Sequence, residues 1–280
     1  MKPQNILVPV DFSACSKKAL LVAIQLAKTF GSKLVIMNAC ENPQGFGDIS
    51  EATMAEEFLK SLETKARKSY QELEASIPQL KEVPHEFVIR HAYVKVAVLD
   101  MLMVDEFDLI VIGTTGASGF KQVFMGSNAY DIIKHADCPV LAIPEESHVH
   151  TAMKHIVLAG DYDRTYSKST FHFLIDLARA KNAEIQILHV GDTLVPDTAK
   201  MAEGNKLEHH FEGLKHTSHY VVDVNVDEAI KDFLTEHETD LLVLVFKKHS
   251  WLDRFFRGNI TKRMAFHSKT PLLILKARKS

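Results

Sequence analysis

The chain has 280 residues, of which 46% are hydrophobic and 25% are charged, and its formal net charge is −3. This composition is that of a globular protein long enough for two domains, and the small net charge favours neither a nucleic-acid nor a membrane partner. The three cysteines show no paired spacing, which favours a reducing compartment. With no signal-peptide pattern and no run of about 18 apolar residues, we expect a cytoplasmic protein without a membrane span.

The first half alternates between short apolar strands and helices. An apolar run at residues 5–10 precedes Asp11, and Ser13 is placed to cap a helix that ends at Gly31. The later elements are expected as a strand at 33–38, a helix at 50–75, a strand at 86–89, a helix at 94–104, and strands at 108–112 and 138–143. Their Val, Ile and Leu content on both faces is typical of parallel strands between helices.

The second half repeats this order. The matching segments are 5–11 with 155–161, 33–38 with 184–189, 108–112 with 240–244, and 138–143 with 270–275. Such ordered matches indicate an internal duplication. We therefore predict domains at residues 1–146 and 151–280, each an α/β doubly wound fold with a five-stranded parallel sheet in the Rossmann-like order 3-2-1-4-5. The second domain is shorter, and we expect its loss within residues 191–220, at the second helix.

Glycines follow the fourth predicted strand. Gly113 and Gly116 come directly after it, and Gly126 with Ser127 opens the next helix. Glycine lets a ligand approach the backbone amides, and a helix N-terminus attracts anions. Because the first and fourth strands are neighbours in the predicted order, Asp11 and Gly113 should share one crevice. The segment thus predicts a phosphate site, with the aspartate accepting hydrogen bonds from a sugar hydroxyl.

The end of the second strand adds a place for a base. Asn38 and Ala39 are positioned there, so a nucleoside polyphosphate fits the arrangement. Each residue alone has a simpler interpretation, because glycines after strands often only form turns and an aspartate often caps the next helix. The joint arrangement favours the nucleotide.

The first half resembles a universal stress protein domain. That family's phosphate motif is glycine, two residues, glycine, nine residues, glycine, then serine or threonine, and residues 113–127 contain it. Residues 6–13 and 137–141 resemble the family's first and last strands, and the resemblance extends to both halves, so it implies a tandem member. It implies a site for ATP, with or without Mg²⁺, lined by Pro9, Val10, Asp11, Ala39, Ile112, Gly113, Gly116, Gly126, Ser127 and Asn128.

The second half departs from this motif. Val245, Lys248 and Asn259 stand in the places of Gly113, Gly116 and Ser127, while Asp161 and Gly258 persist. The larger side chains would crowd the phosphates and remove the freedom for positive φ. A basic cluster could hold an anion, but a solvated loop is the simpler interpretation; it comprises Lys247, Lys248, His249, Arg254 and Arg257. We predict that this half does not bind ATP and serves as a partner domain.

Several other sites are not supported by the sequence. There is no Walker A motif, dinucleotide fingerprint or nucleophile elbow. No metal site is predicted, because the densest histidines lack cysteines and a helical i, i+4 pair; they are His209, His210, His216 and His219.

The sequence leaves three functional hypotheses open. The leading hypothesis is a regulatory or stress-response protein that binds ATP in its first half. A slow ATP hydrolase is the alternative, for which Asp131 and Lys121 are the available groups near the glycines. A scaffold with a vestigial site is the third.

The last strand of each half bears on assembly. Residues 140–143 and 272–275 are apolar and would lie at sheet edges, which tend to be paired. By resemblance, single-domain relatives dimerise through this strand. We therefore predict that the two halves pair with each other, and the sequence leaves a further homodimer open.

Overall fold

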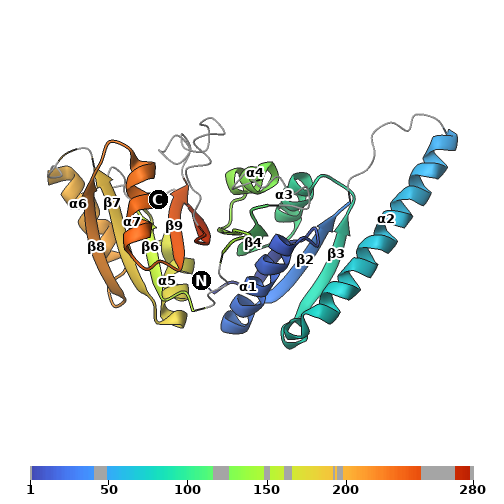
Figure 1. Ribbon diagram of the computed structural model, residues 1–280, viewed down its shortest axis with the longest axis horizontal. Coiled ribbons are helices and arrows are strands. Elements are labelled where there is room, and N and C mark those ends of the chain that lie inside the picture. Colours follow the sequence, from blue (N-terminus) through green and yellow to red (C-terminus); the bar gives the residue numbers. More distant parts are fainter. Residues whose placement is uncertain are drawn as a thin grey trace.

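The strands of both halves join in one sheet. The computed structural model describes residues 2–40, 49–115, 126–147, 152–160, 166–191, 193, 198–246 and 269–277. Its ten-stranded sheet has the order β3-β2-β1-β4-β5-β10-β9-β6-β7-β8, and the two halves lie side by side along it (Figure 1). The predicted order 3-2-1-4-5 is confirmed in each half.

The first half contains the strands and helices that the sequence predicted and, in addition, a 3₁₀ helix. They are β1 (Asn5–Pro9), α1 (Ala14–Phe30), β2 (Lys33–Ala39), α2 (Ile49–Ser76), the 3₁₀ helix η1 (Pro78–Glu82), β3 (His85–Arg90), α3 (Val94–Val104), β4 (Leu109–Gly113), α4 (Ser127–His135) and β5 (Val140–Ile143). Both caps of α1 are confirmed: the Ser13 hydroxyl accepts a hydrogen bond from the Ser16 amide at 3.2 Å, and Gly31 adopts φ 75°.

The second half has the same series in shorter form. Its elements are β6 (His155–Ala159), the 3₁₀ helix η2 (Lys168–Phe171), α5 (His172–Lys181), β7 (Glu184–Gly191), α6 (Thr198–His209), β8 (Lys215–Val222), α7 (Val226–Glu236), β9 (Leu241–Phe246) and β10 (Leu272–Lys276). The shortening falls on the second helix, because α6 has 12 residues where α2 has 28.

Individual polar contacts repeat as well. The Asp108 carboxylate accepts a hydrogen bond of 2.7 Å from the Gln4 amide, just before β1. In the second half the Asp240 carboxylate accepts one of 2.7 Å from the Lys154 amide, just before β6. Each aspartate therefore ties the start of the fourth strand of its half to the start of the first strand.

Helices cover both faces of the sheet. Alternate residues of each central strand point to opposite faces, so Ile6 and Val8 pack with residues of α1 and the segment after α2, and Leu7 packs with α3 and α4. In the second half α5 and α6 continue the first layer and α7 the second. The central strands are buried on both faces, whereas β3 and β8 form the partly exposed outer edges.

The halves meet through their last strands. β5 and β10 pair antiparallel, with Ala142 opposite Leu272 and Val140 opposite Ile274, while the other described strand pairs are parallel. Lys276 at the end of β10 donates a hydrogen bond to the Ile133 carbonyl near the end of α4. The contact thus joins a strand of the second half to a helix of the first.

Among the described residues, no helix is both long and apolar enough to cross a membrane. The three cysteines are buried free thiols.

Candidate functional site

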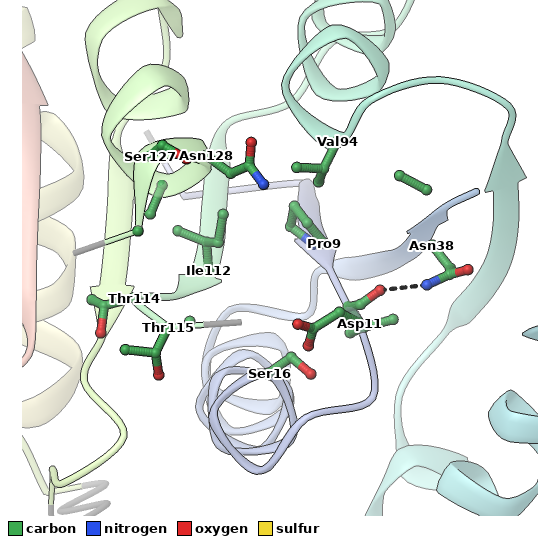
Figure 2. A pocket seen from close by; sticks show the side chains of 15 residues that line it. Pro9, Asp11, Ser16, Asn38, Val94, Ile112, Thr114, Thr115, Ser127 and Asn128 are labelled. Carbon is green, nitrogen blue, oxygen red and sulfur yellow. Dashed lines mark hydrogen bonds between the residues drawn. The ribbon is translucent and has the colours of Figure 1, made fainter. Parts of the chain in front are cut away.

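A cavity of about 310 Å³ lies at the carboxyl ends of β1, β2 and β4, beside the N-terminus of α4. This is the edge where ligands bind in open parallel sheets. Figure 2 shows the side chains that surround it. The lining residues are Pro9, Val10, Asp11, Ser16, Asn38, Ala39, Val94, Ile112, Gly113, Thr114, Thr115, Gly126, Ser127, Asn128 and Ala129.

Most of the residues expected at the site lie around this one cavity. Pro9, Val10 and Asp11 come from the end of β1, and Ala39 from the end of β2. Those from β4 and α4 are Ile112, Gly113, Gly126, Ser127 and Asn128. Gly116 lies outside the described residues, as do Asp161, Gly258 and the basic cluster of the second half.

The wall from β1 is set by a tight turn. Oδ1 of the exposed Asp11 accepts a hydrogen bond of 3.1 Å from the Ser13 amide, so the carboxylate holds the turn into α1. Phe12 between them has φ 63°, a left-handed conformation that is uncommon for a bulky residue, and its ring packs against Phe87. The aspartate thus has the capping contact of the simpler interpretation and also lines the cavity.

Asn38 lines the cavity, and its side chain also makes structural contacts. Its side-chain amide donates a hydrogen bond of 2.8 Å to the Val10 carbonyl (Figure 2), and its oxygen lies 3.5 Å from the Cys40 thiol. The Asn38 side chain therefore holds the end of β1. Ala39, the next residue, has no polar side chain and leaves an apolar surface at the cavity wall. Burial, with a smaller contribution from Glu63, raises the pKa of the Cys40 thiol.

Gly113 is required for close packing and not for positive φ. A Cβ there would lie 2.8 Å from the Cys15 sulfur and 3.1 Å from the Cys15 carbonyl carbon. Gly126 has φ −61°, and the described glycines with positive φ are Gly31 and Gly213. The expectation that the motif glycines need positive φ is therefore wrong for the two that are described.

The N-terminus of α4 is open toward an anion. Gly126 is its N-cap and supplies no capping side chain, and the first turn contains no acidic residue. The Gly126 amide donates to the Thr114 carbonyl at 2.6 Å, which holds the end of β4 against the helix. Free amides and the positive end of the helix dipole suit a phosphate or carboxylate.

Sequence reasoning missed some lining residues. Thr114 and Thr115 lie inside the glycine-rich run, so their position was a usable signal. Ser16, Val94 and Ala129 carry no motif, since they line the cavity only because α1, α3 and α4 pack there. The buried Thr114 hydroxyl has no hydrogen-bond partner among the described residues.

Of the two groups considered for hydrolysis, Asp131 is described and does not line the cavity. Asp131 forms an ion pair with Lys95 at 3.2 Å, which braces α4 against α3. Lys121 lies outside the described residues.

At the described strand ends of the second half, larger side chains stand where the first half has its cavity. Strand register makes Val245 the counterpart of Gly113, and it is 8% exposed. Gly160 is the counterpart of Val10, but a Cβ on it would lie 2.7 Å from Leu207 of α6. Among the described residues, the ends of β6 and β9 are therefore packed by aliphatic side chains.

An aromatic pair closes the end of β7. His189 takes the place of Asn38 and its Nδ1 contacts the Gly160 carbonyl at 3.1 Å, so the polar contact is kept with a larger ring. Tyr220 packs 5.4 Å from this ring and covers Gly191, where a Cβ would lie 2.6 Å from the tyrosine Cζ.

Comparisons of the sequence and of the fold with known proteins all point to the same family. The sequence profile of the Universal stress protein family matches residues 2–144 and 153–276. A universal stress protein of Methanocaldococcus jannaschii is 30% identical over 149 residues, which cover 50% of this chain and 81% of that protein. One from Synechocystis is 25% identical over 290 residues, covering 96% and 99% of the two chains. The crystal structure of a universal stress protein from Archaeoglobus fulgidus has a TM-score of 0.69 at 16% identity, covering 99% and 97%, a similarity of fold.

Proposed function

The chain belongs to the universal stress protein family, and on that premise we propose that it is a stress-response protein that binds ATP in its first half. One observation carries the proposal: the cavity of about 310 Å³ combines the tips of β1 and β4 with the uncapped N-terminus of α4. Its volume is at the lower end of the range of small-molecule sites, about 300–1,000 Å³.

Each part of a nucleotide has a place in this proposal. The phosphates lie on the first turn of α4, where Ser127 and Asn128 supply amides and polar side chains. The sugar hydroxyls face the exposed carboxylate of Asp11. The base lies toward Ala39 and Val94, the small apolar side chains of the cavity wall.

Any Mg²⁺ at this site would be bound mainly through the phosphates of the nucleotide. Asp11 is the one carboxylate among the described lining residues, and no group of three metal-binding side chains occurs in the described part of the chain. Asp11 would thus be the carboxylate ligand that the protein supplies, and the phosphates and water would supply the rest.

Binding is favoured over hydrolysis because Asp131 is engaged with Lys95. A hydrolase needs a group that positions the attacking water and charges that stabilise the leaving phosphate. We propose a single site because Val245 and Leu207 occupy the equivalent place in the second half.

The first experiment denatures freshly purified full-length protein and identifies any released nucleotide, followed by calorimetric titration with ATP, ADP and AMP. The proposal expects about one bound ATP per chain. Absence of both released nucleotide and binding heat would contradict it, and recovery of ADP after incubation with ATP would support the hydrolase.

A charge at the helix start makes the test specific. Ser127→Asp should keep α4 folded, because an acidic residue stabilises a helix N-terminus, yet repel a phosphate and weaken ATP binding by roughly tenfold or more. Thr198→Asp is the matched control, since it places the same charge in the first turn of α6. Equal loss in both variants would contradict the proposed site.

The domain boundaries, 1–146 and 151–280, belong to the same proposal, as does a cytoplasmic location. We also propose that pairing of β5 with β10 persists in solution and makes a single chain a pseudo-dimer. Light scattering tests this: a monomeric mass supports it, and a dimer that dissociates when β10 is interrupted by a proline would contradict it.

A further inference from the structure

A carboxylate from outside the glycine-rich segment reaches the rim of the cavity. The hydroxyl of Thr115, a lining residue, donates a hydrogen bond of 3.0 Å to Oε2 of Glu145, 30 residues further along the chain. The Glu145 side chain is exposed and follows the end of β5. A threonine hydroxyl carries one proton, so it donates to one acceptor at a time.

The backbone around Glu145 is held in place. Lys18 of α1 donates hydrogen bonds to the carbonyl oxygens of Glu145 and Ser147, the second at 3.0 Å. The buried Ser147 hydroxyl donates back to the Pro144 carbonyl at 2.7 Å and closes the turn. The carboxylate is therefore presented from a fixed turn, and only its side-chain torsions let it move away from the cavity.

Thr115 lines the same cavity as Ser127 and Asn128 of α4. The neighbouring Thr114 carbonyl accepts the hydrogen bond from the Gly126 amide at 2.6 Å, so this segment lies against the start of α4. A ligand whose phosphates extend from the first turn of α4 toward Thr115 would compete with Glu145 for the proton of the Thr115 hydroxyl. Two negative groups then face each other, and their repulsion grows with the charge of the ligand.

The second half lacks this carboxylate together with the glycine-rich segment. Strand register makes Leu275 of β10 the counterpart of Ile143 of β5. Ala277 therefore stands where Glu145 stands in the first half. The charge therefore occurs in the half that has the described cavity and is absent at the equivalent position of the other half.

We propose that Glu145 is a specificity-determining residue of this site, which disfavours a ligand in proportion to the negative charge that it brings to Thr115. The inference rests on the proposed function, because it concerns how the same cavity ranks adenine nucleotides. It raises the affinity of AMP relative to ATP. Because the carboxylate is exposed, salt screens the effect.

The test compares Glu145→Gln with Glu146→Gln in the full-length chain. Both side chains are exposed and adjacent, but only Glu145 has the contact to Thr115. Calorimetry with ATP and AMP at about 0.05 M and about 0.5 M salt measures the ratio of the two affinities. Glu145→Gln should strengthen ATP binding by about threefold to tenfold at low salt, and AMP binding less. Glu146→Gln should change the ratio much less.

A second variant distinguishes an effect of the Thr115–Glu145 hydrogen bond from a long-range effect of the Glu145 charge. In a Thr115→Val background, the gain from Glu145→Gln should shrink, because the hydroxyl that holds the carboxylate at the rim is gone. An unchanged ATP-to-AMP ratio in Glu145→Gln, or an equal shift in Glu146→Gln, overturns the inference while nucleotide binding stands. If the parent chain binds neither nucleotide, the proposed function fails and the inference with it.

Discussion

The two halves of the molecule share a strand order but fill the carboxyl edge of the sheet differently. In the first half Gly113 allows β4 to approach α1, and the cavity remains open beside α4. In the second half Val245, Tyr220 and Leu207 occupy the equivalent places. A doubly wound sheet therefore offers a place for a ligand, but the volume of a few side chains at the strand ends decides whether one can enter.

Substitutions at the ends of β4 and β9, Gly113→Val and Val245→Ala, should have the largest effect. Gly113→Val should destabilise the protein by about 3 kcal/mol, because its Cβ would meet both the side chain and the backbone of Cys15. Val245→Ala should cost less, about 2 kcal/mol, since it removes buried methyl groups without a clash. Urea denaturation measures both. Parent-like stability of Gly113→Val would mean that α1 can shift and that the glycine is not a packing requirement.

Replacing the aromatic cover of β7 should have a smaller effect. Tyr220→Ile introduces the residue type found at the equivalent position, Ile89, and loses the 2.8 Å hydrogen bond to the Thr193 carbonyl. We expect a loss of about 1 kcal/mol. Tyr220→Phe is the control that keeps the ring over Gly191 and should lose less. If the two variants are equally unstable, the hydroxyl and not the ring sustains this packing.

Two groups beside the last strands, Lys276 in β10 and Cys138 just before β5, should change the free energy of unfolding in opposite directions at alkaline pH. Lys276 stands where the first half has Pro144, and burial lowers its pKa to about 8, while burial raises the pKa of Cys138 to about 12. Above pH 8 the unfolded chain holds the extra lysine proton, so stability rises with pH. Above pH 9 the unfolded chain loses the thiol proton that the folded chain keeps, which offsets the rise.

The net gain is about 1 kcal/mol between pH 8 and 9, followed by a plateau. Denaturation at a series of pH values measures it. Lys276→Met should remove the rise, and Cys138→Ala should extend it to higher pH. A rise that survives in Lys276→Met would assign it to other groups.

Acid should affect the second half first, with the smallest effect of the four. Burial lowers the pKa of His210 and of His219, and the neighbouring His237 adds to the shift of His219. The unfolded chain binds protons below about pH 6.5 that the folded half resists, so stability is lost as pH falls through that range. Hydrogen exchange at pH 7 and at acidic pH would locate the loss. Equal loss in both halves, or no relief in His210→Gln and His219→Gln, would contradict this assignment.

The fold could be predicted because it depends on local patterns. Apolar runs gave the strands, Ser13 and Gly31 bounded α1, and α3 spans the predicted residues 94–104. Parallel strands with intervening helices allow few arrangements, and the repeat restricted them further.

The site could be predicted only in outline. The end of a strand can be located from its sequence, but the neighbours of each side chain depend on how distant elements pack. Nothing near Gly113 indicates that Cys15 is the reason for the glycine, and nothing near Thr115 indicates Glu145. Asn38 faces the Val10 carbonyl because the turn after β1 brings that oxygen over β2.

The antiparallel joint between β5 and β10 lies within one polypeptide. Two identical subunits joined in this way would carry every substitution twice, so a change that closes one site would close both. A tandem chain is free of that constraint, because each half has its own codons. If the proposed single site is right, the covalent link fixes the ratio of binding to non-binding halves at one to one and allows a permanently asymmetric assembly.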